Sequence, residues 1–153
     1  MSKFAIKTIE PVRGNYQQVK QLVILDDNVD ADKIQAEINK NELEKKAAGI
    51  EGILDIYESS LEIKYQSAFR GIISIMNRGA NGQIISKDKF KEVTPKNESV
   101  KEYEFKFQDL RVYAIKIPHG KLILSGGFKN QQKKDFSKFR SVKRKYLESI
   151  QSK

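Results

Sequence analysis

Residues 103–125, YEFKFQDLRVYAIKIPHGKLILS, carry the clearest structural signal in the chain. In the first part of this stretch, aromatic residues alternate with charged or amide residues, which is the period-two pattern of a half-buried β-strand. Asp109 and the segment 118–120 interrupt the pattern with residues typical of tight turns. We therefore expect an antiparallel meander of three strands, 103–107, 110–117 and 121–125.

A basic segment and a helical pattern follow the meander. Residues 126–136 read GGFKNQQKKDF, with three lysines just after an apolar run. Apolar residues then recur at helical spacing: Phe136, Phe139, Val142, Tyr146, Leu147 and Ile150. Much of the remaining helix surface is basic: Lys138, Arg140, Lys143, Arg144 and Lys145. We expect this helix to dock its apolar face on the sheet and to present its cations to solvent.

The N-terminal part is mainly helical in pattern. Residues 4–9 predict a first strand, and residues 21–25 are compatible with a second. A helix is expected to begin after Asp30, a good N-cap residue. A longer helical period runs through Leu43, Ala47, Ile50, Leu54, Tyr57, Leu61, Tyr65, Phe69, Ile72 and Met76. It predicts one long helix or two, and the serines at 59–60 favour a break there and so a helical hairpin.

Together these elements predict an α+β fold. The expected sheet is small and antiparallel, made of the N-terminal strand and the three-stranded meander, and is packed by the helical hairpin and the C-terminal helix. We expect one domain over 1–153, in which 1–100 hold the first strand and the extended helical region and 101–153 hold the basic meander and helix. Residues 86–100 are polar and are expected to form an exposed connection.

Composition excludes several classes of function. The sequence has no cysteine and one histidine, so thiolate metal sites and histidine clusters are excluded, and we expect no metal and no cofactor. The first residues become polar too soon for a signal peptide, and no apolar run is long enough to span a bilayer. We therefore expect a cytoplasmic protein that does not associate with membranes.

Charge is distributed unevenly along the chain. Basic and acidic residues balance over 1–100, so the whole net charge of +9 lies within 101–153. A basic region of this kind favours a polyanionic partner, most simply a nucleic acid, because binding releases condensed counterions. Charge alone is also compatible with an acidic protein partner or a membrane surface.

The residues from about 103 to 147 resemble those of the RelE/ParE superfamily of bacterial toxins, in particular its RelE-like and HigB-like branch. The similarity lies in an aromatic and basic strand, an arginine that opens the next strand in the segment LRVY, and an apolar strand that ends in the basic segment GGFKNQQKK. The order of elements, with a strand and a helical zone before the meander and a helix after it, is also similar. The first 100 residues match only in their type of element.

This resemblance implies a type II toxin-antitoxin toxin that cleaves messenger RNA on the ribosome without a metal. In such cleavage the 2′-hydroxyl attacks the adjacent phosphate, and cations stabilise the phosphorane. The resemblance assigns catalytic positions to Lys106, Arg111 and Lys129, and phosphate binding to Lys133 and Lys134. The RNA or ribosome and a cognate antitoxin are the implied partners.

The sequence departs from the family pattern at two positions. A second basic residue of the first meander strand is replaced by Glu104, and an acid-base tyrosine is replaced by Phe136, which cannot transfer a proton. His119, Tyr113 and Tyr146 are the candidate replacements for the proton-transfer group.

Other functions fit the same residues. The cations of the last helix, Arg140, Lys143 and Arg144, are candidate RNA-binding residues. They also fit a non-catalytic protein that binds nucleic acid or the ribosome. A ParE-like inhibitor of DNA gyrase would share the fold without the cleavage chemistry.

Overall fold

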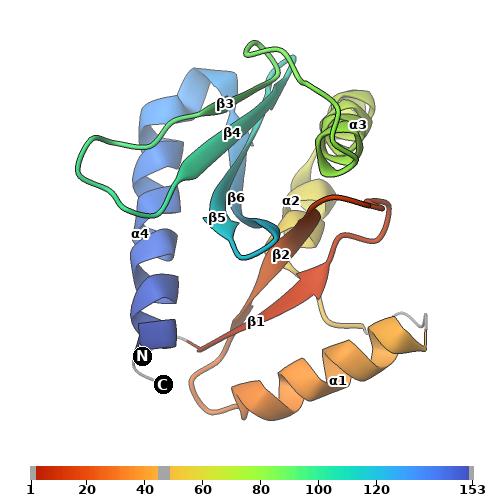
Figure 1. Cartoon of the computed structure of the whole chain (residues 1–153), viewed down its shortest axis with the longest axis vertical. Helices are drawn as coiled ribbons and strands as arrows, with labels where there is room; N and C mark the ends of the chain where they lie inside the picture. Colours follow the sequence, from red (N-terminus) through yellow and green to blue (C-terminus); the bar gives the residue numbers. More distant parts are fainter. Residues whose placement is uncertain (1–2, 45–48, 152–153) are drawn as a thin grey trace.

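A six-stranded sheet forms the centre of the molecule, as a computed structural model that describes residues 3–44 and 49–151 shows (Figure 1). The strands are β1 (Lys3–Thr8), β2 (Gln18–Leu25), β3 (Phe90–Glu92), β4 (Glu102–Phe107), β5 (Leu110–Ile117) and β6 (Gly120–Phe128). The helices are α1 (Ala31–Leu43), α2 (Ile53–Ser60), α3 (Gln66–Ala80) and α4 (Gln132–Gln151), with short 3-10 turns η1 (Ile63–Tyr65) and η2 (Lys129–Gln131). Helices α1, α2 and α3 lie on one face of the sheet and α4 covers the other (Figure 1). The predicted α+β class is confirmed.

The sheet is larger than predicted and is mixed. Its order is β1-β2-β6-β5-β4-β3, so β2 lies between the first strand and the meander and β3 adds an edge strand within the connection expected over 86–100. Strand β2 pairs with β6 in parallel, from Gln18 opposite Gly120 to Gln21 opposite Ile123, whereas all other neighbouring strands are antiparallel. A parallel pair needs a long crossover connection, and the helical region between β2 and the meander provides it.

The predicted meander is present as β4, β5 and β6. Lys106 pairs with Arg111 across β4 and β5, and Arg111 pairs with Gly127 across β5 and β6. Both hairpin turns contain a residue in the left-handed region, Gln108 with φ 51° and His119 with φ 68°. Tyr113 pairs with Ser125 and Ala114 with Ile123, so Leu124 is the extra residue of a β-bulge in β6.

Each face of the sheet has its own apolar core. The face under α2 and α3 contains the larger cluster, in which Ile72 and Val112 are fully buried. The face under α4 is centred on Phe139, which packs with Leu122 and Tyr113. The strands of the meander thus contribute alternate side chains to two cores, as their alternating pattern requires.

Helix α1 ends earlier than the helical spacing of the apolar residues predicts. Leu43 is the last residue of α1 and is 85% exposed, and Gly49 adopts φ 68° outside any helix. The prediction of continuous helix through Leu43 and Ile50 is therefore wrong, and Ala47 lies outside the described residues. The side-chain oxygen of the buried Gln21 accepts hydrogen bonds from the N–H groups of Leu54 (2.9 Å) and Asp55 (3.1 Å), which fixes the start of α2.

The expected break near residue 60 is confirmed. Helix α2 ends at Ser60 and α3 begins at Gln66, with η1 between them. The rings of Tyr57 and Phe69 approach to 6.3 Å between centroids, and both helices pack mainly on the sheet. Within the connecting segment 61–65, Leu61 is buried and Ile63 is 91% exposed.

Candidate nucleic-acid interface

Lys106, Arg111 and Lys129 lie at one end of the meander. Lys106 and Arg111 face each other across β4 and β5, close to the turn that joins these strands. The N–H of Lys129 donates to the carbonyl of Asp109 in that turn at 2.8 Å, which holds η2 beside it. The fold therefore brings the backbone of Lys129, from the segment after β6, to the hairpin that carries Lys106 and Arg111.

The side chain of Arg111 forms hydrogen bonds within its own hairpin. Its side chain is buried, and Nη1 donates to the carbonyl oxygens of Gln108 and Leu110, both at 2.7 Å. The buried Nε has no hydrogen-bond partner among the described residues. This guanidinium therefore stabilises the turn and retains an unused donor.

A buried polar cluster surrounds Arg111 beneath the start of α4. Glu104 accepts a hydrogen bond from Gln132 Nε2 at 3.0 Å through one oxygen, while its other oxygen is unpaired in the described part of the chain. The hydroxyl of Tyr113, which is opposite Glu104 on β5, is also unpaired there. Asp135 accepts from the N–H of Phe128 at 3.0 Å. These carboxylates lie inside the fold and add no charge to the surface.

The candidate proton-transfer groups do not reach the lysines at the meander end. Tyr113 is fully buried, and burial together with the charges of Glu104 and Asp135 raises its pKa. Burial likewise raises the pKa of Tyr146, which packs edge-on against Phe4 with ring centroids 5.8 Å apart. His119 is exposed in the turn after β5, about 20 Å along the strand from Arg111 at the usual rise per residue. Phe136 packs on Tyr113, with ring centroids 4.8 Å apart.

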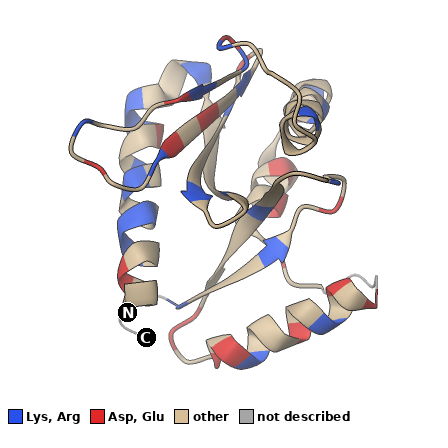
Figure 2. Ribbon diagram, in the orientation of Figure 1, with Lys and Arg blue, Asp and Glu red and all other residues tan. Residues whose placement is uncertain are grey.

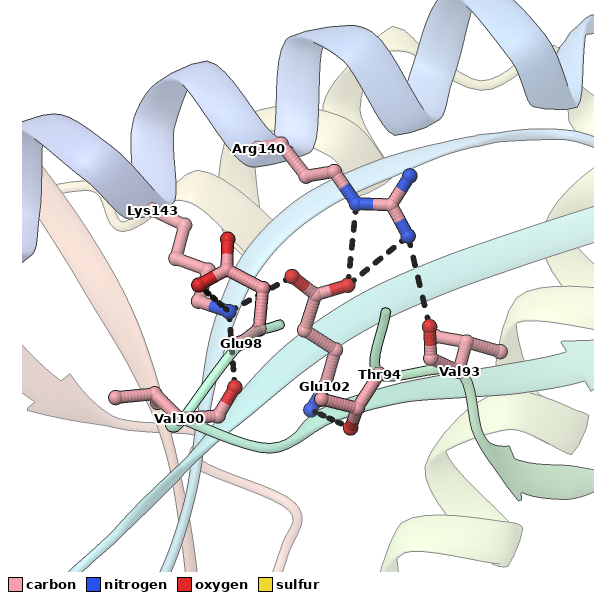
Figure 3. A network of polar contacts seen from close by, with 7 residues as sticks. All are labelled: Val93, Thr94, Glu98, Val100, Glu102, Arg140 and Lys143. Atoms are coloured by element: carbon pink, nitrogen blue, oxygen red, sulfur yellow. Dashed lines mark hydrogen bonds and ion pairs between the residues drawn. The ribbon is translucent and has the colours of Figure 1, made fainter. Parts of the chain in front are cut away.

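Lys143 does not face solvent, which corrects the prediction that all cations of the helix would do so. Its ammonium is buried and donates to Glu102 Oε2 at 2.7 Å and to the carbonyl of Val100 at 2.9 Å (Figure 3). Arg140 contacts the other oxygen of Glu102 through Nε (3.2 Å) and Nη2 (3.1 Å), as Figure 3 shows. Glu98, 47% exposed, lies 3.9 Å from the same ammonium. These two cations attach α4 to β4 and to the loop before it.

The remaining cations of η2 and α4 are exposed. They are Lys129, Lys133, Lys134, Lys138, Arg144 and Lys145. The only acidic residue between 129 and 147 is Asp135, which is buried, so the exposed charges of this segment are all positive. Figure 2 shows how often basic positions recur along the ribbon of α4. We call these six residues the basic surface.

An open groove runs along α4 and shares Lys133 and Arg144 with this surface. It has a volume of about 570 Å³ and is lined by Lys133, Phe136, Ser137, Arg140, Ser141 and Arg144. The guanidinium of Arg140 stacks over the Phe136 ring at 4.7 Å. Cations, hydroxyl groups and an aromatic ring in one groove are the side chains that bind phosphates and bases.

Lys106 is less available than the cations of the basic surface. Its backbone N–H donates to the carbonyl of Lys89 at 2.7 Å. The pKa of the Asp88 carboxyl is lowered, mainly by a hydrogen bond from Ser86 and in smaller part by the charge of Lys106. Lys106 is half-buried, whereas the six residues of the basic surface are exposed.

The sequence contained a signal for the buried ion pairs that its interpretation missed. Phe139, Lys143 and Tyr146 follow one another at steps of four and three, which places Lys143 on the apolar stripe of the helix. Asp135 lies on the same stripe, four residues before Phe139. Charged residues on a buried stripe indicate partners inside the fold, and Glu102 is the partner of Lys143.

No set of three or more potential metal ligands gathers within residues 3–44 and 49–151. Over the same ranges, no helix combines the length and apolar character required to cross a membrane. Comparison of the sequence with known protein families, with curated proteins and with solved structures finds no match.

Proposed function

We propose that this protein binds RNA through the basic surface and acts as a metal-independent endoribonuclease toxin of a toxin-antitoxin system. One observation carries the binding step: six exposed cations follow η2 and α4 without an exposed acid among them. RNA binds favourably to such a surface because several cations together displace the counterions that are condensed on its phosphates.

The cleavage step is supported by the position of Lys106, Arg111 and Lys129 at the adjoining end of the meander. Attack of a 2′-hydroxyl on the adjacent phosphate forms the new P–O bond, expels the 5′-oxygen and leaves a cyclic phosphate. Lys106 and Lys129 are the groups at this end that can exchange protons with RNA, while the buried guanidinium of Arg111 adds positive charge behind them without contacting the phosphorane.

Binding is tested by the salt dependence of affinity. Fluorescence anisotropy with a short single-stranded RNA compares the wild type with Lys133→Gln/Lys134→Gln/Lys138→Gln. Loss of three phosphate contacts lowers the slope of log affinity against log salt by about 2. The matched control, Lys33→Gln/Lys40→Gln/Lys96→Gln, removes three exposed lysines outside the basic surface. Equal losses in both triple variants would show that only net charge matters.

Cleavage is tested separately by primer extension on messenger RNA in a translating extract. New 5′ ends are expected with the wild type and are lost in Lys129→Ala, which leaves α4 intact. Bacterial growth arrest on expression is the parallel readout. An absence of cleavage by the wild type contradicts the toxin assignment.

A second candidate is a non-catalytic protein that binds nucleic acid or the ribosome with the same surface. It is favoured by the burial of Tyr113 and Tyr146 and by Phe136 at the position where the family has a tyrosine. RNA binding without cleavage, in the two experiments above, is the outcome that selects it.

The toxin proposal also implies an antitoxin. An acidic or amphipathic segment that covers the basic surface fits this role, since it would replace RNA phosphates by carboxylates. Co-purification with the product of the neighbouring gene tests this partner, and a high-salt wash is expected to weaken the complex.

A further inference from the structure

A pocket lies on the face of the sheet opposite the basic surface. It has a volume of about 320 Å³ and is formed by the C-terminal half of α3 and the strands beneath it. Ile75, Met76 and Ala80 line its helix side, and Phe90 and Phe105 line its sheet side. Pockets of this size, mainly apolar with a few polar groups, are typical of small-molecule sites.

Lys121 is the cation of this pocket. Its ammonium donates to the side-chain oxygen of Gln17 at 2.6 Å and lies over the rings of Phe90 (5.2 Å) and Tyr103 (5.1 Å). No acidic side chain forms an ion pair with Lys121 within 3–44 and 49–151. The lysine is therefore held by a neutral acceptor and two aromatic rings.

This environment disfavours the charge of Lys121 in the absence of an anion. Burial and the charge of the cross-strand neighbour Lys116 lower the pKa of Lys121. An anion in the pocket would compensate both effects, because it supplies the missing opposite charge at a partly desolvated site. The amide groups of Gln17 and Gln83 in the lining offer further donors.

Two exposed apolar side chains lie next to residues that line the pocket. Ile84, between the lining residues Gln83 and Ile85, is 99% exposed. Tyr16 is 78% exposed, and its ring lies against Gly82, where an added Cβ would come within 2.9 Å of it. A ligand with an apolar body would bury part of these side chains, whereas an inorganic anion would not.

We propose that this pocket binds a small amphiphilic carboxylate, with the carboxylate on the Lys121 ammonium and the apolar body against α3. Gly79 and Ala80 leave room for this body, and Met76 supplies an adaptable contact. The site lies across the sheet from the basic surface, so it is independent of the proposed RNA binding.

The experiment uses the full chain and monomeric decanoate, with decanol as the uncharged probe of equal length. The sequence contains two methionines, so methyl-labelled methionine gives two NMR signals, and Met76→Leu assigns the one from the pocket. Decanoate is expected to shift the Met76 signal in a saturable way and to bind about tenfold more tightly than decanol, as one charge-assisted hydrogen bond predicts.

Two variants separate the contribution of the Lys121 charge to affinity from that of the apolar lining. Lys121→Gln is expected to reduce decanoate affinity to that of decanol, while Lys116→Gln, the exposed neighbour outside the lining, retains the preference. An unmoved Met76 signal, or equal affinity of the wild type for both probes, overturns the proposal. The wild-type comparison needs no variant and therefore remains decisive if Lys121→Gln does not fold.

Discussion

Glu102 and Glu104 occupy equivalent places and have very different partners. Both lie on β4, both side chains are buried, and both face α4. Glu102 contacts Arg140 through one oxygen and Lys143 through the other. Glu104 accepts one hydrogen bond, from the neutral Gln132, and one of its oxygens is unpaired among the described residues.

This difference shows that α4 is attached in two ways. At Glu102 the helix is held by ion pairs whose removal leaves a buried charge without compensation. At Glu104 the helix covers a polar cluster in which several groups lack partners. We therefore expect Glu102 to determine the stability of α4 docking, and Glu104 itself to tolerate substitution.

Glu102→Gln is expected to give the largest effect. It keeps the size of the side chain but leaves Lys143 without its charged partner, and breaking a buried pair costs about 3–5 kcal/mol. Urea denaturation followed by circular dichroism measures the free energy of unfolding. Arg144→Gln, an exposed change on the same helix, serves as control and is expected to stay within about 0.5 kcal/mol of the wild type.

Asp135→Ala is expected to destabilise the fold by about 1–3 kcal/mol. The substitution leaves the N–H of Phe128 without its acceptor, and an unpaired buried donor carries its desolvation penalty. Asp135→Asn keeps an acceptor oxygen and is expected to lose less, in the same urea titration. Equal losses for Ala and Asn would show that charge, not the hydrogen bond, is what matters at this position.

Glu104→Gln is expected to cost about 1 kcal/mol or less, because an amide oxygen can still accept from Gln132. It is the direct counterpart of Glu102→Gln, with the same strand, burial and chemical change. The variant also removes one of the charges that raise the pKa of Tyr113, so ultraviolet titration should find this tyrosine ionising at lower pH. Equal destabilisation by the two glutamate variants would contradict the difference between the two ends.

Tyr113→Phe is expected to change stability little at neutral pH and more in alkali. Burial raises the folded-state pKa of Tyr113 above the ordinary value of about 10, so its contribution is fully present below that pH and is lost as pH rises above it. Without Tyr113, unfolding free energy should fall less steeply above pH 10. Burial also raises the pKa of Tyr57, Tyr103 and Tyr146, which contribute to the slope that remains. Tyr16→Phe, at an exposed ring, is the control and should keep the wild-type slope.

Local patterns predicted the C-terminal half of the fold well. The alternation over 103–107 and the helical spacing from Phe136 gave strands and a helix where the structure has them. The helical period through Leu43 and Ile50 failed because it ignores backbone signals such as Gly49, whose positive φ lies outside any helix. The parallel pairing of β2 with β6 has no local signature, since it depends on how the intervening helices return the chain to the sheet.

The candidate site was predicted in part. Sequence patterns placed Lys106 and Arg111 at one hairpin, and the resemblance assigned Lys129 to the same site; in the structure the backbone of Lys129 is bonded to the turn of that hairpin. The burial of Lys143 depends on Glu102, which is 41 residues away, so only its place on the apolar stripe indicated it. Lys121 had no motif around it and became notable only because β3, β4 and α3 surround it.

The parallel pairing of β2 and β6 has a consequence for the order in which the protein is made. Gln18 and Gly120 are 102 positions apart in sequence, yet their strands lie side by side near the centre of the sheet. During synthesis, β1 and β2 therefore emerge long before the strand that completes their pairing, and β2 exposes an unpaired edge in the meantime. Closing so long a loop slows folding. A nascent chain that ends before β6 is a form in which a chaperone would find an unpaired strand to bind.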